Sequence, residues 1–402
     1  MKKKIFVRAP CLSQSGYGEQ SRFALRALKS REDLFEVYLQ PIPWGRTGWV
    51  WEDNEFRQWM DERIIKTQLM IQEQKLQPDA SLQITIPNEF EQICPINIGF
   101  TAGMETSKVS DEWIQKGNIM DKILVVSNHS KNTFVNTKSK VRNPITGEDV
   151  EIKLETPIDV TWESTPRAEA EEIPGFDLKT KFNFLMVSQM GPRKNFAKAI
   201  CWWIEEFIDQ NVGLIVKTNV RGNSRMDLEA TEGSLKALLN LYPDRKCKVY
   251  LMHGDLSAGQ MTSLYTHPKV KAIVNIAHGE GFGLPLFEAA REGLPVITVG
   301  WSGQLDFLHH DGNDYFQKVD YTIGPVQPEA VWDGVIEQDS MWAFADQGSY
   351  KMTLRDTRKN IRKAKATANK LQKILTDKFS DEKLYAEFCE QINSAINTKE
   401  EK

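Results

Sequence analysis

The sequence lacks paired cysteines, long apolar runs and a strong excess of charge of either sign. Its five cysteines are scattered through 402 residues and no two are spaced as C-x-x-C, which argues against a disulfide framework and a cysteine-rich metal site. Reduced thiols in a cytoplasmic protein fit this pattern best. No apolar stretch approaches the length of a transmembrane helix, and the apolar segment at residues 5–7 ends at Arg8, too short for a signal peptide.

Charge and composition exclude further classes. A net charge of −4 gives no general case for a nucleic-acid or membrane binder. Hydrophobic residues make up 41% and charged residues 26% of the chain, as in an ordinary globular protein. Because 402 residues exceed what a single core usually holds, the length predicts two domains.

The most informative stretch is residues 272–303, which has the pattern of a strand, a tight loop, a helix and a second strand. Residues 272–277 are apolar except for one Asn, which is typical of a strand buried on both faces of a parallel sheet. The segment GEGFG at residues 279–283 allows a tight turn. Pro285 falls at the expected first helical position and Gly293 at the expected C-terminal cap.

This arrangement suits the binding of a nucleotide-sugar. Free backbone amides at the start of a helix can receive phosphate oxygens, aided by the helix dipole. The amides expected here are those of Gly281, Phe282, Gly283 and Leu284. Glu288, in the first helical turn, can accept hydrogen bonds from the two hydroxyls of a ribose, while Glu280 can accept them from a sugar attached to the phosphates.

The segment EGFGLPLFE at residues 280–288 resembles the E-x7-E signature of retaining, GT-B-fold glycosyltransferases of family four, and GLPVI at residues 293–297 continues the likeness. In that family the first Glu contacts the donor sugar and the second contacts the nucleotide ribose. The resemblance therefore implies these roles for Glu280 and Glu288. It also implies an α/β fold of the GT-B type, with two Rossmann-like, doubly wound domains facing a central cleft.

Catalysis would need positive charge at the β-phosphate of the leaving nucleotide. No acidic metal cage is evident, so side chains are expected to supply that charge without a metal or other cofactor. Lys194 matches the Lys of the resembled family, but Gln189 stands where the family usually has an Arg. Arg193 and Lys217 are the candidates to replace it. The predicted catalytic set therefore includes Glu280, Lys194 and Arg193.

Candidates outside this stretch are weaker. The loop containing Gly16 and Gly18, between the first strand and a helix expected at residues 19–28, could place amides near the donor. Many members of the resembled family carry a histidine in the first domain; Glu105 stands there instead, placed to touch the acceptor. His253, at a strand end of the second half, is expected to line the nucleotide pocket, together with His278.

Strands alternating with helices divide the chain into two doubly wound halves. The predicted boundaries are residues 1–164 for an acceptor-binding domain and 165–180 for a linker. A donor-binding domain is expected at residues 181–379, with a long basic helix at about residues 354–373. Residues 380–402 are expected to form a helix that crosses back to the first domain, as in the resembled fold, and Leu384, Phe388, Ile392 and Ile396 give it an apolar stripe at intervals of four residues. A hairpin insertion is expected at about residues 138–162, around the turn NPITG at residues 143–147.

The leading interpretation is a metal-independent, retaining glycosyltransferase that moves a sugar from a nucleotide-diphosphate donor to an acceptor hydroxyl. A nucleotide-sugar epimerase or hydrolase, and a non-catalytic sugar-nucleotide-binding protein, stay open as alternatives. A dinucleotide oxidoreductase is disfavoured because no G-x-G-x-x-G follows a strand. The acceptor is a saccharide, a lipid-linked saccharide or, as a minority option suggested by the tryptophans of residues 44–51, a modified nucleic acid.

Overall fold

The computed structural model describes residues 2–142 and 147–400. They form two compact units. Unit 1 comprises Met1–Ser164, Val331–Ser340 and Ser380–Lys402, and unit 2 comprises Thr165–Ala330 and Met341–Phe379. The units divide after Ser164 and after Phe379. Residues 165–180, predicted as a linker, lie within unit 2, and the passage of Val331–Ser340 into unit 1 was not predicted.

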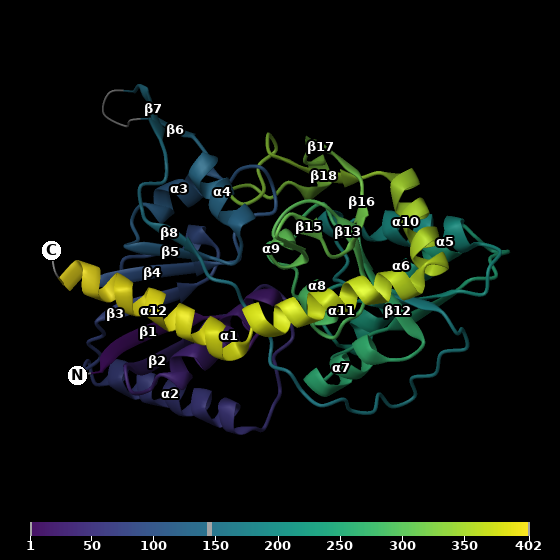
Figure 1. The fold of residues 1–402 in the computed structure, drawn as a ribbon. Coiled ribbons are helices and arrows are strands. Elements are labelled where there is room, and N and C mark those ends of the chain that lie inside the picture. Colours follow the sequence, from purple (N-terminus) through teal and green to yellow (C-terminus); the bar gives the residue numbers. More distant parts are fainter. Residues whose placement is uncertain (1, 143–146, 401–402) are drawn as a thin grey trace. The chain divides into compact units, whose positions relative to one another are not determined.

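Unit 1 is built on a six-stranded, entirely parallel sheet with the order β2-β1-β3-β4-β5-β8 (Figure 1). Its strands are β1 (Lys3–Ala9), β2 (Phe35–Pro41), β3 (Ala80–Ile84), β4 (Ile96–Thr101), β5 (Lys122–Val125) and β8 (Ile158–Val160). Every residue of β3 and β4 is buried, as expected for central strands covered on both faces.

Short polar residues start the helices of unit 1. The side chains of Ser15, Asn54, Ser110 and Ser127 each accept a hydrogen bond from a backbone amide of the following helix. The helices are α1 (Gly16–Ser30), α2 (Glu55–Gln72), η1 (Pro87–Glu89), α3 (Asp111–Gly117), α4 (Asn128–Asn136) and α12 (Asp381–Glu400). Because Ser15 is the cap, α1 begins at Gly16, and the prediction that Gly16 and Gly18 lie in a loop is wrong.

The expected hairpin insertion is present but shorter than predicted. Strands β6 (Ser139–Arg142) and β7 (Asp149–Ile152) pair in antiparallel fashion. The predicted range of about 138–162 was too long, because β8 pairs with β5 in the main sheet rather than with the hairpin. Residues 143–146 of the predicted turn lie outside the described residues.

The segment Val331–Ser340 is part of unit 1 through specific contacts. The carbonyl of Gly334 accepts hydrogen bonds from Asn88 Nδ2 and Ser110 Oγ, each at 2.9 Å. Lys108 forms an ion pair with Asp339 at 2.6 Å. Val335 is buried in the same apolar cluster as Phe90 and other residues of unit 1.

Unit 2 repeats the architecture with a second parallel sheet, in the order β11-β10-β9-β12-β13-β16. Its strands are β9 (Asn183–Val187), β10 (Gly213–Lys217), β11 (Lys248–Met252), β12 (Val270–Asn275), β13 (Val296–Val299) and β16 (Gln317–Val319). Two small antiparallel pairs, β14 (His309–His310) with β15 (Asn313–Asp314) and β17 (Tyr321–Pro325) with β18 (Met341–Ala345), complete the strands. The prediction of α/β, doubly wound architecture is confirmed.

The helices of unit 2 are α5 (Phe196–Phe207), α6 (Arg225–Leu239), α7 (Ala258–Thr266), α8 (Leu284–Arg291), α9 (Leu305–Leu308), α10 (Gln347–Lys359) and α11 (Ile361–Lys378), with η2 (Pro192–Lys194) and η3 (Pro328–Ala330). The prediction of one basic helix at residues 354–373 is wrong, because Asn360 interrupts it and separates α10 from α11. Asn195 does not cap α5 with its side chain, which donates to the carbonyl of Ile276 at 3.2 Å.

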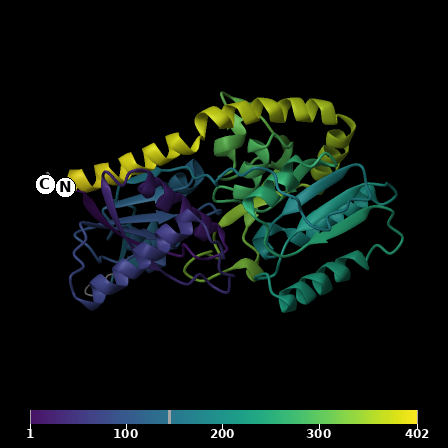
Figure 2. The same cartoon turned by 90° about the horizontal axis from the view of Figure 1, so that it is seen from below.

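Helix α12 completes the core of unit 1. It lies beside α1 and also contacts β4 (Figures 1 and 2). Leu384, Phe388, Ile392 and Ile396 recur at intervals of four residues and are at most 1% exposed, so the predicted apolar stripe is confirmed. The ring of Phe388 lies 5.8 Å from that of Phe23 in α1 and 5.5 Å from that of Phe100 in β4.

Replacing Phe388 by Ala should lower the free energy of unfolding of unit 1 by about 3–5 kcal/mol, because it leaves a cavity between α1, β4 and α12. Glu387→Ala, at the exposed neighbouring position, is the control and should change stability by less than about 0.5 kcal/mol. Denaturant unfolding of the full chain, followed by fluorescence, measures both. Equal midpoints for the two variants would show that α12 does not contribute to this core.

Candidate active site

The candidate site in unit 2 lies at the carboxyl ends of β9 and β12. The strand order of the sheet reverses between these neighbours, since β9 continues to β10 and β11 on one side while β12 continues to β13 on the other. Ligands of open α/β sheets bind at such a reversal, beyond the carboxyl ends of the strands. Arg193 and Lys194 follow β9 in η2, and Glu280 follows β12.

Glu280 is the centre of this cluster. Its carboxylate is 8% exposed and accepts from Lys194 Nζ at 2.6 and 2.7 Å. Arg193 NH1 reaches Oε2 at 3.2 Å and also donates to the Gly279 carbonyl at 2.8 Å. Asn275 Nδ2, at the end of β12, donates to Oε1 at 2.9 Å. The two cations and the carboxylate predicted from the sequence are thus brought together.

The electrostatics keep Glu280 ionised. Burial alone would raise the pKa of its carboxyl, but the charges of Lys194 and then Arg193 outweigh burial and lower the pKa of Glu280 to about 2. The hydrogen bonds from Lys194 and Asn275 act in the same direction. A buried negative charge is therefore held between two cations.

Residues after β13 hold the Glu280 loop in place. Glu280 N donates to Ser302 Oγ at 2.8 Å, and that hydroxyl donates to Gln304 Oε1 at 2.8 Å. The amide of Gly303 donates to the carbonyl of Glu280 at 2.9 Å. A Cβ at Gly303 would lie only 1.8 Å from the carbonyl oxygen of Gly281, so only glycine permits this approach. The sequence did not predict that Asn275, Ser302, Gly303 and Gln304 would hold Glu280 in place. A Ser-Gly pair directly after a buried strand was the one local pattern that could have indicated it.

Helix α8 begins directly behind this loop. Gly283 has φ +93°, a left-handed conformation that favours glycine, and Leu284 is the first helical residue. Phe282 turns its ring into the core, 5.1 Å from Phe307 and 5.4 Å from Phe287. Any contact of Phe282 with a donor phosphate would therefore use its backbone. Gly293 has φ +70° and ends the helix, as its position predicts.

Glu288 and Lys217 occupy another part of the site. The prediction that Glu288 lies in the first turn of the helix is wrong, because α8 begins at Leu284 and Glu288 is in its second turn. Tyr265 donates its hydroxyl to Glu288 Oε2 at 2.8 Å. Lys217, at the end of β10, donates to the carbonyl of Gly254 at 3.0 Å. Burial lowers the pKa of Lys217, and the charges of Asp255 and Glu288 oppose that shift. Lys217 therefore interacts electrostatically with Glu288, while Arg193 is the second cation beside Glu280. Gln189, which stands where the resembled family has an Arg, is exposed.

The two histidines considered from the sequence have structural partners. His253 Nε2 lies 2.9 Å from Asp227 Oδ1, and Asp227 also accepts the amides of residues 220–222 that lead into α6. His278 is 1% exposed, bonds the carbonyl of Ala343 through Nδ1 and Gln327 through Nε2, and stacks on Trp342 at 4.8 Å. The interpretation of His278 as a pocket-lining residue is therefore wrong.

Gly16, Gly18 and Glu105 belong to unit 1. The amide of Gly18 donates to Ser15 Oγ at 3.1 Å, so the helix cap uses it, and a Cβ at Gly18 would lie 1.9 Å from the carbonyl oxygen of Ser13. Gly18 is thus required by packing. Gly16 has open space around it. Glu105 is half-buried after β4, where its charge acts on the buried Tyr17 phenol.

A buried acid of unit 1 was missed. Glu163 follows β8 and is 4% exposed. Burial, aided by the charge of Glu19, raises the pKa of Glu163 to about 8, and its charge also acts on Tyr17. Tyr17 bonds Thr101 at 2.8 Å and its ring lies 4.2 Å from that of Trp44. These residues gather at the carboxyl ends of β1, β4 and β8, the corresponding edge of the first sheet.

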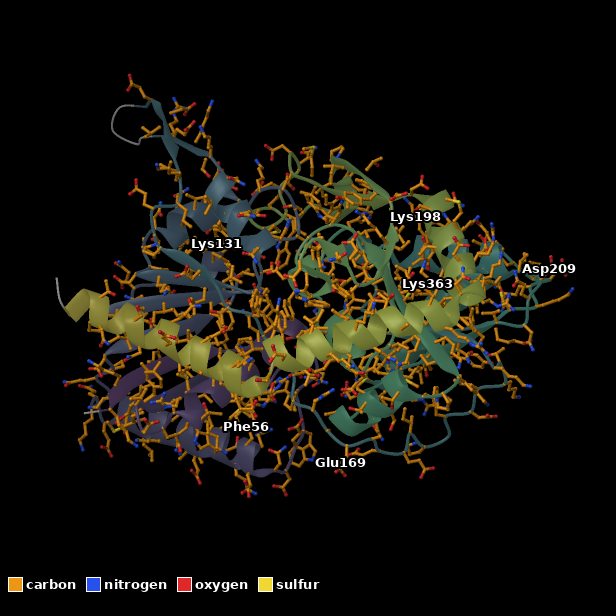
Figure 3. The ribbon with its side chains drawn as sticks, viewed as in Figure 1. Phe56, Lys131, Glu169, Lys198, Asp209 and Lys363 are labelled. Atoms are coloured by element: carbon orange, nitrogen blue, oxygen red, sulfur yellow. The ribbon has the colours of Figure 1, made fainter. Side chains whose placement is uncertain are left out.

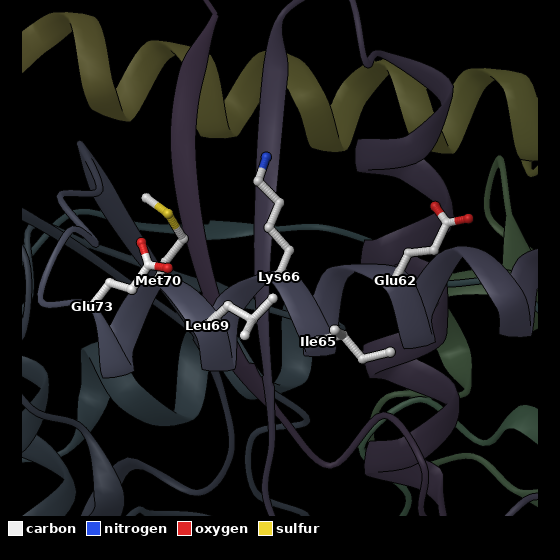
Figure 4. A pocket seen from close by; sticks show the side chains of 6 residues that line it. All are labelled: Glu62, Ile65, Lys66, Leu69, Met70 and Glu73. Carbon is white, nitrogen blue, oxygen red and sulfur yellow. The ribbon is translucent and has the colours of Figure 1, made fainter.

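A different hollow lies on the outer side of α2, between Glu62, Ile65, Lys66, Leu69, Met70 and Glu73 (Figure 4). Lys66 is paired with Glu36 at 2.5 Å and Glu73 with Lys75 at 2.7 Å, so the charges that line this hollow are balanced locally.

Among residues 2–142 and 147–400, no three His, Cys, Asp or Glu side chains gather as metal ligands would. No helix within these ranges combines the length and apolarity that a membrane crossing requires.

Removing the Lys194 ammonium from Glu280 should change the stability of unit 2 in a pH-dependent manner. The folded-state pKa of Glu280 is depressed, so its contribution to stability is present above the unfolded value and is lost as the pH falls toward 2. Lys194→Met should lower the free energy of unfolding at pH 7 by on the order of 3–5 kcal/mol, because it leaves a buried charge with less compensation. The loss should shrink by about pH 3.

Denaturant unfolding of the wild type and the variant at both pH values measures this difference. Lys198→Met is the control, since Lys198 is an exposed lysine of α5 (Figure 3). A loss of equal size at both pH values would show that the Lys194–Glu280 pair does not set the titration of Glu280.

Comparison with known sequences finds no match to a protein-family model. Over 116 residues the chain is 31% identical to the serotype-specific mannosyltransferase WbdA of Escherichia coli. That segment is 29% of this chain and 13% of WbdA, so the chain matches only a small part of the relative's length.

Solved structures match almost the whole chain. HepE of Anabaena, in complex with UDP and glucose, superposes with a TM-score of 0.62 over 98% of this chain and 100% of its own, at 12% identity. Sucrose-phosphate synthase of Thermosynechococcus elongatus gives 0.63 over 99% and 100%, at 11% identity. A structure of trehalose-6-phosphate from E. coli, bound with UDP-2-fluoro glucose, gives a TM-score of 0.58 over 98% of this chain and 99% of its own, at 10% identity. The chain therefore shares the GT-B fold of these structures.

Proposed function

We propose that this protein is a retaining glycosyltransferase that takes a sugar from a nucleotide-diphosphate sugar and needs no metal ion. The observation that carries the proposal is the Glu280 carboxylate held by Lys194 and Arg193 beside the start of α8. The fold, and the UDP or UDP-sugar in neighbouring structures, support the same donor class.

The donor pyrophosphate is proposed to lie against the start of α8. There it would receive the amides of the loop at residues 281–284 and the positive end of the helix dipole. The ribose would be bound by Glu288, which lies in the next turn of the same helix. A nucleotide in this orientation places its β-phosphate near Lys194 and its sugar near Glu280.

Donor binding requires Lys194 to change partners. All four acceptor positions of the Glu280 carboxylate are used here, two by Lys194 and one each by Asn275 and Arg193. When the ammonium turns to the β-phosphate, two of these positions become available to sugar hydroxyls. Asn275 and Arg193 then keep the carboxylate oriented and ionised.

In the reaction, the bond between the sugar C1 and the β-phosphate oxygen breaks on one face of the sugar. The acceptor oxygen bonds to C1 from that same face, and its proton passes to the departing phosphate oxygen. Negative charge grows on the β-phosphate during this step, so Lys194 and Arg193 stabilise the transition state more than the bound donor. The acceptor hydroxyl is proposed to bind unit 1 near Glu105, at the sheet edge that also carries Tyr17 and Glu163.

A screen of UDP-, GDP-, ADP- and TDP-sugars in excess EDTA tests the activity. We expect one base to support transfer to a saccharide acceptor at a rate unchanged by the chelator, and NMR of the product to show the anomeric configuration of the donor. Lys194→Ala should lower turnover at least about tenfold, which corresponds to 1.4 kcal/mol of lost transition-state stabilisation. Activity that disappears in EDTA and returns with Mn²⁺ would refute metal independence. Release of free sugar alone would indicate a hydrolase or epimerase. Binding of a nucleotide-sugar without turnover would indicate a non-catalytic protein.

Glu288→Ala should weaken nucleoside-diphosphate binding by on the order of 1.5–3 kcal/mol, because two hydrogen bonds from the ribose to a carboxylate are lost. The wild type should prefer UDP over 2′-deoxy-UDP, and the variant should not. Tyr265→Phe is the matched control, since it removes the hydrogen bond to Glu288 but keeps the carboxylate. Calorimetry with both nucleotides measures the preference, and a variant that still prefers the ribose form would remove this role from Glu288.

A further inference from the structure

A second pocket of unit 2 lies at the opposite edge of its sheet from Glu280. It is bordered by the start of β12 and the residue before β13, whereas Glu280 follows the end of β12. One face of α11 borders it, with Ile361, Arg362, Lys365, Ala366 and Asn369 spaced at three to four residues. We call it the β12–α11 pocket. Its other lining residues are Tyr265, Thr266, His267, Pro268, Val270, Lys271, Glu292, Leu294 and Pro295.

Positive charge dominates this pocket. Lys271, Arg362 and Lys365 line it, and His267 adds a group that can also bind an anion. Glu292 is the single acid among the lining residues, and Arg167 already engages it at 3.2 Å. This local excess of cations stands out in a chain whose formal net charge is −4.

The cations repel one another in the absence of an anion. Burial lowers the pKa of His267, and the charges of Lys269 and Lys271 lower it further. Burial also lowers the pKa of Lys365, and Lys271 again acts in the same direction. An anion placed among these groups would relieve that repulsion and be attracted by all of them.

The inner part of the pocket is apolar. Tyr265, Val270 and Leu294 form its floor and are at most 5% exposed, and Ile361 lies at its border. The cavity measures about 670 Å³, within the range of small-molecule sites. Such a shape and charge fit a compact molecule with an apolar body and a phosphate group.

We propose that the β12–α11 pocket binds a small phosphate monoester, with its phosphate between Lys271 and Arg362 and its apolar body on Val270 and Leu294, and that its occupancy alters nucleotide binding at Glu288. The binding part is independent of the proposed transferase activity. The coupling part rests on the proposed nucleotide site.

Two physical links connect the pocket with Glu288. Tyr265 forms part of the pocket floor and donates its hydroxyl to Glu288 Oε2 at 2.8 Å. Helix α8 begins at the Glu280 loop and ends at Arg291, two residues before Gly293, whose carbonyl accepts a hydrogen bond from the pocket residue Lys365 at 2.5 Å. A ligand that displaces Tyr265, or that forms an ion pair with Lys365 in place of its bond to Gly293, therefore changes the surroundings of Glu288.

Calorimetry with phenyl phosphate tests the binding part, with inorganic phosphate and phenol as the two half-ligands. We expect one site per chain for phenyl phosphate, with an affinity at least tenfold above that for inorganic phosphate. The double variant Lys271→Ala/Arg362→Ala should weaken binding at least tenfold. Lys365 is left in place because it bonds Gly293.

The matched control is Lys363→Ala/Lys370→Ala, which removes the same charge from exposed positions of α11 that do not line the pocket (Figure 3 labels Lys363). It should stay within twofold of the wild type. An equal loss in the two double variants would show that only diffuse surface charge attracts the anion and would overturn the site. No measurable heat for phenyl phosphate at millimolar concentration would overturn it as well.

The coupling part is tested by titrating UDP, or the nucleotide that the donor screen selects, into protein saturated with phenyl phosphate and into protein without it. We expect a change in nucleotide Kd of at least threefold, and the reciprocal change in the Kd of phenyl phosphate. Tyr265→Phe should abolish the change. An unchanged nucleotide Kd would overturn the coupling, whereas a protein that binds phenyl phosphate but no nucleotide would refute the proposed function alone.

Discussion

The candidate site of unit 2 depends on one buried charge. Glu280 is ionised in a place where a lone carboxylate would be costly, and two cations together with Asn275 make that state stable. The same cations are the groups that a pyrophosphate needs. The site is therefore held in order by an internal anion. In the proposed function the substrate partly replaces this anion, and donor binding exchanges one set of charge contacts for another of similar kind.

If the proposed function is right, such an exchange limits how tightly the donor ground state can bind. Every contact that Lys194 makes with a phosphate is offset by one that it gives up with Glu280. As the sugar leaves, charge accumulates on the phosphate while the charge of Glu280 stays constant, so the balance shifts toward the phosphate during the reaction. This arrangement directs the attraction of Lys194 to the transition state.

The sequence was informative where local rules decide the structure. The apolar runs predicted the buried strands of both sheets, the glycines and Pro285 predicted the loop and start of α8, and the four-residue stripe predicted α12. The sequence was less informative where contacts between residues far apart in the chain determine the structure. The close approach of Gly303 to Gly281, the bond from Tyr265 to Glu288 and the stacking of His278 on Trp342 each join segments whose proximity follows only from the folded chain. Gly18 shows the same limit, because its glycine is required by the carbonyl of Ser13 and not by a ligand.

The position of α12 has a consequence for synthesis of the chain on the ribosome. Phe23 and Phe100 are translated early, yet the ring that covers them belongs to Phe388. The first sheet therefore emerges with part of its apolar face exposed and stays so while all of unit 2 is made. Unit 2 has its own core in Phe184, Trp203 and Phe207, and its last residue, Phe379, is made before α12. The order of completion is thus the reverse of the order of translation, and the amino-terminal half is the one exposed to chaperones and proteases for longer.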